Sequence, residues 1–522
     1  MVLFEWVVVL LCGAVVLAAL ARRIGAPYPA FLAVGGAAVA LLPEGPRLAL
    51  DPGLALALFV APIVLDAAYD ASVRDLRANW LHLVRLIVVV VTLTTLAVAA
   101  LARTLRPSMP LSVAVVLGAV VAPPDASAAM AVMYQIRPPH RIRVILQGES
   151  LLNDVVALLI YRFAISASTR AAPSPMTAVA MGVLVLGGSV VAGAFLARLW
   201  IWLTARVRDV PSHIVLQFVS TFGIWMIAER VGLSPILTLV AYAISLARRG
   251  SAVMPARVRV PSSAVWDTSV FVLNVLAFVL IGLQIRPIFE RMSQAARAQD
   301  LRFAAAVLAT VIVVRLAWLI AIEAMTQVGH DSRAEPAEAA PGTRLKHIIL
   351  VAWCGMRGIV TLAAALALPL EFPERDLIVL TAFAVVFGTL LIQGLTFRPL
   401  IHLLDVRDDH SVQREIHLGW TQGLSAALGS LDGDMSPAAI ALRRDYEQAL
   451  RQAAEVRDLP EPTAPPPLPS NAPRRRAIGA ARAAISTLRS RGEIGDDAFH
   501  ALEEHLDRVE LMTDPELLGP DS

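Results

Sequence analysis

The feature that most constrains the fold is a series of apolar segments, each long enough to cross a lipid bilayer as a helix. About 20 apolar residues in a helix span the hydrocarbon core, which is about 30 Å thick. We find about 13 such segments, several of them short or tilted. They lie near residues 2–21, 28–42, 52–69, 80–103, 109–134, 142–165, 176–204, 212–230, 233–247, 264–285, 301–325, 346–370 and 376–404. The sequence therefore predicts an all-α polytopic membrane protein.

Composition supports this class and argues against several others. Hydrophobic residues make up 57% and charged residues 17% of the chain, and the mean hydropathy is +0.66. These values exceed what a soluble core needs. The net charge of +3 predicts no nucleic-acid partner, because the arginines lie mainly in short loops between apolar segments. Cys12 and Cys354 both fall inside apolar segments, so we expect neither a disulfide framework nor a thiolate metal site.

The distribution of basic residues among the loops predicts the orientation in the membrane. Loops on the side of the C-terminal tail are richer in Arg and Lys, which predicts an outside N-terminus and a cytoplasmic tail. The outside loop at 286–302 is the exception, since it carries four arginines. The apolar run from residue 2 lacks the basic region and cleavage site of a signal peptide, so we expect it to remain as the first transmembrane helix. A multi-pass protein of the cell (inner or plasma) membrane is the expectation.

One polar motif lies within the apolar segment near 142–165. Glu149 and Asn153 are four residues apart, as are Ser150 and Asp154. On a helix they form two neighbouring polar stripes on one face. Acidic residues inside a membrane span cost a few kcal/mol and usually mark a functional site, although a Glu-Ser start is also typical of an ordinary helix N-terminus. The motif predicts a site for a hard cation.

Two apolar segments are interrupted by residues that break helices. In the first, Pro123 and Pro124 precede Asp125. A proline pair in mid-membrane disrupts the helical hydrogen bonds, and the freed carbonyls must be satisfied by protein, water or an ion. Asp125 is then either a cation ligand or an N-cap of the second half-helix.

The second interruption is the run from Gly355 to Gly358, in which glycines flank Arg357 inside an apolar segment. The interrupted segments are the fifth and the twelfth, which is the relation expected for two inverted repeats of six helices joined by a linking helix. Broken helices at matching places in two halves point to the binding site of a transporter. We expect the two to cross at the midplane, where Asp125 and Arg357 neutralise the partial charges of the half-helix ends. Two unrelated kinks are the alternative.

Arg315 stands near the middle of an apolar segment, too far from either end for its guanidinium to reach water. It therefore needs a buried anion. Glu149 is the preferred partner, because this ion pair leaves Asp125 and Asp154 available to exchange ligands. The alternative is an arginine bound only by backbone carbonyls.

Together these residues resemble the monovalent cation/proton antiporter family, which includes bacterial sodium/proton antiporters of the NhaP type and animal sodium/proton exchangers. The resemblance covers roughly residues 1–405. It rests on five features in this order: Leu65-Asp66-Ala67-Ala68-Tyr69, the Asp125 segment, Gly148-Glu149-Ser150-Leu151-Leu152-Asn153-Asp154, Arg315, and Gly355-Met356-Arg357-Gly358. The third of these motifs is highly specific.

The resemblance implies roles for the site residues. Asp154 would be the principal carboxylate that binds the cation and the proton, and Asp125 and Ser150 would be its co-ligands. Asn153 would be the neutral neighbour found in the electroneutral branch of the family, and Glu149 would pair with Arg315. The resemblance also implies a homodimer, with spans 1–3 and 7–10 forming the dimerisation part and the broken-helix bundle forming the moving core.

One departure from the family pattern affects the expected selectivity. The family usually has Thr-Asp-Pro at the first broken helix, whereas this chain has Pro124-Asp125-Ala126. The carboxylate keeps its place, but the threonine hydroxyl is absent and the proline has moved. The sequence therefore leaves the preferred cation open.

The expected function is exchange of sodium or lithium for protons by alternating access, without ATP and with one cation exchanged for one proton. We find no phosphate-binding loop of the Walker type, and we expect no cofactor and no enzymatic activity. A potassium/proton antiporter using the same residues is the main alternative. A membrane sensor that transports nothing is a more remote one, and a membrane hydrolase is remote because no nucleophile is paired with a base.

After residue 405 the chain becomes charged, and residues 406–522 predict a cytoplasmic helical tail. Its first helical pattern runs to about residue 458, a proline-rich linker follows near 460–473, and a second helical stretch extends from about residue 474 to 512. The second stretch has an apolar face formed by Ile485, Leu488, Ile494, Phe499, Leu502, Leu506 and Leu511. We expect a small regulatory or dimer-contacting module, with a loosely ordered amphipathic tail as the alternative.

Overall fold

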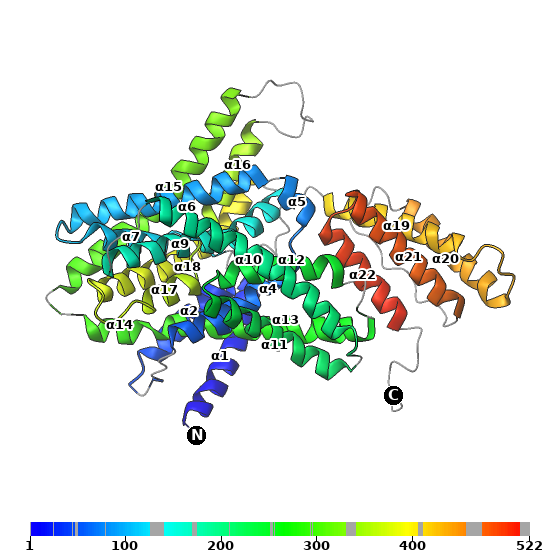
Figure 1. Cartoon of the computed structure of the whole chain (residues 1–522), viewed down its shortest axis with the longest axis horizontal. Helices are drawn as coiled ribbons and strands as arrows, with labels where there is room; N and C mark the ends of the chain where they lie inside the picture. Colours follow the sequence, from blue (N-terminus) through cyan, green and yellow to red (C-terminus); the bar gives the residue numbers. More distant parts are fainter. Residues whose placement is uncertain are drawn as a thin grey trace.

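The fold is an all-helical membrane protein followed by a separate helical module (Figure 1). The computed structural model describes residues 2–24, 26–43, 45–46, 51–78, 80–125, 140–169, 175–207, 209–250, 254, 256–292, 294, 296–329, 341–405, 411–455 and 472–511. In these ranges, nine helical segments are long and apolar enough to cross a membrane, and two shorter apolar helices accompany them. The predicted fold class is confirmed.

Two bundles make up the membrane part, as their helix contacts show. The scaffold bundle consists of α1 (Val2–Ile24), α2 (Tyr28–Ala40), the consecutive α3 (Pro52–Ala55), η1 (Leu56–Val60) and α4 (Ala61–Tyr69), then α10 (Pro175–Thr204), α11 (Val210–Val231), α12 (Pro235–Gly250) and α13 (Ala256–Leu283). The core bundle consists of α6 (Trp80–Leu105), α7 (Leu111–Val121), α9 (His140–Thr169), α15 (Arg297–Gly329), α16 (Pro341–Trp353), α17 (Ile359–Leu366) and α18 (Arg375–Leu404). The short helices α5 (Val73–Ala78) and α14 (Ile285–Arg291) connect elements of the two bundles.

Small residues allow the closest contacts inside the scaffold bundle. A Cβ atom at Gly36 of α2 would collide with the backbone carbonyl of Val279, and one at Gly282 of α13 would collide with the backbone of Ala33. In lipid there is little hydrophobic force between helices, so close backbone contact is a main source of attraction. These two glycines explain why α2 and α13 lie against each other along their length.

Both predicted interruptions fall where helices end. The helix α7 stops at Val121, and residues 122–125 are not helical; the rest of the predicted span, from residue 126, lies outside the described residues. Residues 354–358 separate α16 from α17. Each break leaves the carbonyl end of a helix in the protein interior, where it needs a partner.

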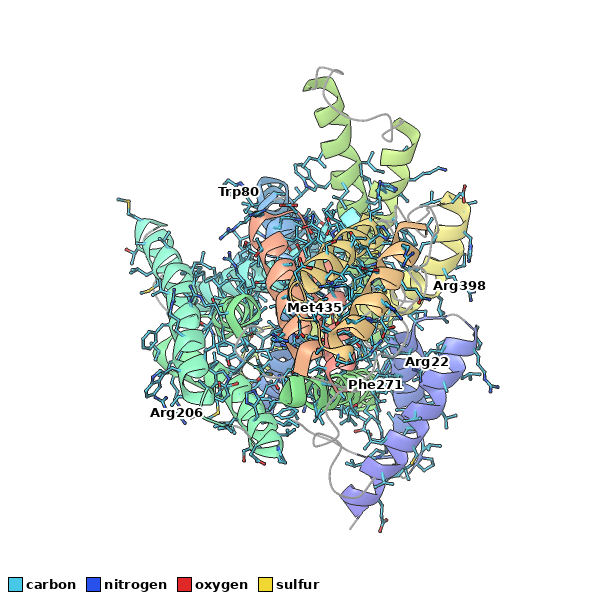
Figure 2. The ribbon with its side chains drawn as sticks, turned by 90° about the vertical axis from the view of Figure 1, so that its right-hand side faces the viewer. Arg22, Trp80, Arg206, Phe271, Arg398 and Met435 are labelled. Carbon is cyan, nitrogen blue, oxygen red and sulfur yellow. The ribbon has the colours of Figure 1, made fainter. Side chains whose placement is uncertain are left out.

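In its described residues, 411–455 and 472–511, the tail forms a module of four helices, α19 (Ser411–Gly429), α20 (Pro437–Glu455), α21 (Ala472–Arg491) and α22 (Asp496–Leu511). It has a hydrophobic core of its own, which includes Leu424, Leu442, Tyr446, Ile485, Leu488, Phe499, Leu502 and Leu506. Figure 2 looks onto the end of the molecule that carries this module, and Met435 lies in front of the middle of the bundles. The predicted linker falls largely outside the described residues, and α21 begins at Ala472.

Candidate functional site

The two interruptions meet in direct contact. The backbone N–H of Asp125 donates to the carbonyl of Met356 at 2.7 Å. A Cβ atom at residue 358 would collide with the carboxylate of Asp125, so only glycine permits this approach. Gly358 is also the N-cap of α17. The carboxylate of Asp125 therefore lies at the N-terminal end of α17, where the helix dipole favours a negative charge.

Arg357 caps the broken end of α7. Its side chain is fully buried, and Nε and Nη2 donate to the carbonyls of Val121 and Ala122 at 3.1 Å each. Its backbone N–H donates to Oγ1 of Thr389 at 3.0 Å, and Nη1 donates to the carbonyl of Gly355. A positive charge at the C-terminus of a helix both satisfies the free carbonyls and opposes their partial negative charge.

Arg315 performs the same task at the end of α16 and also binds a carboxylate. Its Nη1 and Nη2 donate to the two oxygens of Glu149, the latter at 2.8 Å. Its Nε and Nη2 donate to the carbonyls of Ala352 at 3.1 Å and Val351 at 3.2 Å. The structure thus combines the two alternatives that the sequence left open for this arginine, a carboxylate partner and backbone carbonyls.

The polar motif of α9 divides into two stripes with different surroundings. Glu149 and Asn153 are completely buried within the core bundle. Ser150 and Asp154 are half-buried and line a cavity at the boundary with the scaffold bundle. The spacing of four residues places each pair on one line along the helix. One stripe therefore faces Arg315, and the other faces the cavity.

This cavity has a volume of about 40 Å³, and the predicted residues Asp125, Ser150 and Asp154 all line it. Its scaffold side is apolar except for Asn274 of α13 and includes Val60, Val64 and Phe278. The volume suffices for a cation with one or two water molecules. In the described part of the chain no three His, Cys, Asp or Glu side chains gather as a metal site, so the charged groups here are the two carboxylates. The arrangement suits a monovalent cation better than a tightly held divalent one.

Asn274 is a site residue that our sequence reasoning missed. It is 9% exposed, and its Oδ1 atom has no hydrogen-bond partner in the described ranges. The available signal was a single amide within the apolar run from Val270 to Ala277. Polar side chains in such runs normally have a structural or functional task. Here the amide faces Asp125 and Asp154 across the cavity.

The other amide of the motif, Asn153, is enclosed within the protein. Among the residues that the structure describes, neither its Oδ1 nor its Nδ2 atom has a hydrogen-bond partner. A buried amide without partners costs about 1–3 kcal/mol. An amide cannot ionise, so this position adds no charge to the site.

Two larger cavities lie at opposite ends of α13. One, of about 360 Å³, is lined by Asp66, Asp70 and Asp267, and the indole of Trp266 donates to Asp66 at 2.9 Å. The other, of about 680 Å³, is lined by charged residues that include Arg286 and Arg375. Elements of the scaffold bundle line both, and α4 and α13 also line the small cavity. The candidate site is therefore enclosed between two wider spaces.

The chain is similar to known proteins over most of its length. Residues 7–403 match the model of the family described as sodium/hydrogen exchanger, transmembrane. An uncharacterised Na⁺/H⁺ exchanger of Mycobacterium tuberculosis is 28% identical over 98% of this chain and 96% of its own length. A sodium, potassium, lithium and rubidium/H⁺ antiporter of Bacillus pumilus is 28% identical over 81% of this chain and 66% of its own.

The fold is also similar to that of a solved structure. An electron-microscopy structure of the sodium proton antiporter MjNhaP1 from Methanocaldococcus jannaschii aligns with a TM-score of 0.60 at 16% identity. The alignment covers 78% of this chain and 98% of that one. At this identity the likeness concerns the fold alone, and it covers a length similar to that of the two bundles.

Proposed function

Because the chain belongs to the sodium/hydrogen exchanger family, we propose that it exchanges sodium or lithium for protons across the cell membrane, with Asp125, Ser150 and Asp154 as the binding site. The observation that carries this proposal is the meeting of two carboxylates at one small cavity, Asp154 from α9 and Asp125 from the interruption after α7, beside the contact between the two interruptions. Carboxylate and hydroxyl oxygens can replace part of the water shell of a monovalent cation.

Competition between the cation and a proton for this site would couple their movements. Two carboxylates sharing a small cavity repel each other when both are ionised. A bound cation relieves the repulsion, and when the cation leaves, a proton on one carboxylate relieves it instead. The site is therefore occupied by one or the other, which is the requirement for exchange.

Relative movement of the two bundles would carry the site from one side to the other. Asp125, Ser150 and Asp154 belong to the core bundle, whereas α4, η1 and α13 of the scaffold bundle form the opposite wall. A rocking motion at this boundary would connect the small cavity to one of the two larger cavities at a time. No ATP is needed, because the gradient of one ion drives the other.

We propose that the exchange is electroneutral. Glu149 is neutralised by Arg315, and Asn153 carries no charge, so only Asp125 and Asp154 change their charge state. The N-terminus of α17 favours ionised Asp125, which opposes binding of a second proton. The cation-loaded site and the singly protonated site then carry the same net charge.

The test of electroneutrality uses a membrane potential, which moves about 2.3 kcal/mol per net charge per 100 mV. Purified protein in liposomes is given equal pH on both sides, and a potassium diffusion potential is then imposed. We expect no sodium uptake in response to the potential. Sodium uptake driven by the potential alone would contradict one-for-one exchange.

Potassium is the second candidate substrate. The relative from Bacillus pumilus is described as an antiporter for potassium as well as for sodium, lithium and rubidium, and Pro124 replaces the threonine usual in the family. Proton flux in liposomes with lithium, sodium and potassium in turn separates the possibilities. A proton flux that responds to none of the three would instead favour a membrane sensor that transports nothing.

We also propose that the tail module faces the cytoplasm and that the chain forms a homodimer through its scaffold bundle. The tail contacts the loops around Arg74, Arg143 and Arg259. These loops are among the arginine-rich ones that the distribution of basic residues assigns to the inside. Protease added to sealed, right-side-out vesicles should leave the tail intact, and mass measurement in detergent should give two chains per particle.

A further inference from the structure

The tail module is fixed to the core bundle at the first turn of α9. Asp497 of α22 lies 3.4 Å from Nδ1 of His140 and 3.6 Å from Nη1 of Arg143. The same His140 lies against Asp75 of α5, with 2.9 Å between Nε2 and Oδ2. The helix α9 also carries Ser150 and Asp154, so the tail holds one end of the helix that bears the site.

The same face of the tail is fixed to the scaffold bundle at the first turn of α13. Asp507 of α22 accepts two hydrogen bonds from Arg259, one of them from Nε at 2.6 Å, and Glu503 lies 3.0 Å from Nη1 of the same arginine. The ring of His500 stacks on that of Tyr69, the last residue of α4, with 5.7 Å between centroids. The helix α13 forms the scaffold wall of the small cavity, through Asn274 and its neighbours.

A third contact involves the connection between the bundles. The guanidinium of Arg74, in α5, donates to Glu415 of α19 at 2.6 Å. The backbone N–H of Val73 donates to Asp496 of α22 at 2.7 Å. Because α5 follows α4 of the scaffold bundle and precedes α6 of the core bundle, these bonds attach the tail to the segment that connects the two bundles.

Several acidic side chains of this contact are removed from water. Asp496, Glu503 and Asp507 are 5%, 8% and 2% exposed. Buried charges are tolerated when each has a partner, and removing one partner leaves the other stranded at a cost of several kcal/mol. A shifted tail would separate Glu503 and Asp507 from Arg259, and Asp496 from the backbone N–H of Val73. The arginines of α21 that also bind these carboxylates would move with the tail, so the contacts with Arg259 and Val73 are the ones that make the docked position specific.

We propose that the tail module is a clamp that joins α9 to α13 and thereby slows the relative movement of the two bundles. This inference rests on the proposed function, since alternating access requires the bundles to move. The contacts lie at the mouth of the cavity of about 360 Å³, which Tyr69 and Arg259 help to line. Release of either end of the clamp frees the movement, because the tail links the two helices in series.

The experiment compares full-length variants in liposomes by their maximal rate of sodium-driven proton exchange. Asp497→Asn releases the α9 end, and the variant that combines Glu503→Gln with Asp507→Asn releases the α13 end, because it removes both carboxylates that bind Arg259. The matched control is Arg508→Gln on the same helix, whose partner Glu504 is exposed and belongs to the tail itself. Coupling between distant sites typically changes an equilibrium about fivefold or more. We expect each release variant to exchange at least about fivefold faster than wild type, and the control to match wild type.

The variant that combines Asp497→Asn with Glu503→Gln and Asp507→Asn gives the sharpest test. If the tail joins two helices in series, this combined variant is no faster than the faster of the two release variants. If the rate increases of the two release variants multiply in the combined variant, the clamp is overturned. It is also overturned if the variants exchange at the wild-type rate although protease shows that their tail has become more accessible. Size-exclusion chromatography in detergent identifies a variant that has misfolded. If the Asp497 variant misfolds, Arg143→Gln tests the α9 end instead, because it removes a partner of Asp497 on α9. If wild type exchanges no cation for protons, the proposed function fails instead.

Discussion

Two carboxylates on α9, Glu149 and Asp154, lie five positions apart and have opposite surroundings. Glu149 is 1% exposed, and Arg315 binds both of its oxygens. Asp154 faces a cavity of about 40 Å³ that it shares with a second carboxylate, Asp125. Arg315 neutralises the charge of Glu149 permanently, whereas the charge of Asp154 is available to a cation or a proton that enters the cavity. The contrast shows how one helix can supply both stability and ion binding.

The largest effect should follow from removing the charge that faces the cavity. Asp154→Asn keeps the size of the side chain but removes its exchangeable charge, so sodium-driven proton flux in liposomes should fall to that of protein-free liposomes. Asp125→Asn should be nearly as damaging. Asp432→Asn, at an exposed position of the tail, is the control and should keep its flux. Normal flux in the Asp154 variant would remove this residue from the proposed site.

Removing either partner of the Glu149–Arg315 ion pair should lower the stability of the protein. Glu149→Gln and Arg315→Gln each strand a buried partner, so each should cost about 3–5 kcal/mol of stability. The double variant should recover part of this loss, although the carbonyls of α16 would still lack Arg315. Melting of the four proteins in detergent gives the comparison. Purely additive losses would show that the two residues do not act as a pair.

The opposite wall of the cavity offers a smaller change. Asn274→Leu keeps the volume and removes the amide, whose Oδ1 otherwise has no partner. If this oxygen binds the cation, its loss should raise the sodium concentration for half-maximal flux about tenfold, corresponding to about 1.4 kcal/mol. Thr268→Val, exposed on the same helix, should behave as wild type. An unchanged half-maximal concentration would confine the ligands to the core bundle.

His140, the first residue of α9, lies outside the membrane span and contacts two carboxylates. Carboxylates of Asp497 and Asp75 raise the pKa of His140 to about 9 despite its partial burial. Burial acts to raise the pKa of Asp75, but hydrogen bonds from His140 and Ser72 outweigh it and lower that pKa to about 2. Arg143 also lies beside Asp497, and the carboxylate of Asp70 is close enough to repel that of Asp497.

These shifts give the smallest of the expected effects, a dependence of tail docking on pH. The raised pKa of His140 means that its contribution is complete below about 6.5 and is lost as pH rises through about 9. The lowered pKa of Asp75 means that its contribution is lost only as pH falls towards about 2. Protease sensitivity of the tail should therefore rise between pH 7 and 9.5 in wild type and change less in His140→Gln. If protease sensitivity depends on pH equally in both proteins, His140 does not control the docking of the tail.

The two buried arginines show where sequence reasoning stops. The sequence indicated that Arg315 needs a buried anion, because its guanidinium lies too far from either end of the apolar segment to reach water. It gave no sign that the same side chain also caps α16, since that bond joins residues far apart in the chain. Arg357 was expected to oppose a half-helix dipole, but only the structure assigns it to the carbonyls of α7.

Each of the two helical stretches predicted for the tail is divided by a turn in the structure, at residues 430–436 and 492–495. The sequence alone nevertheless allowed us to predict the membrane class, the approximate positions of the apolar helices and the positions of both interruptions. These depend on local properties, namely apolar length, proline and glycine, which act on neighbouring residues. The contacts between distant segments are visible only in the three-dimensional structure. They are the position of Asn274 opposite the two carboxylates, the contact of Asp125 with Gly358, and the docking of the tail on both bundles. Such contacts depend on how distant helices pack, and packing is set by the shapes of all the side chains together.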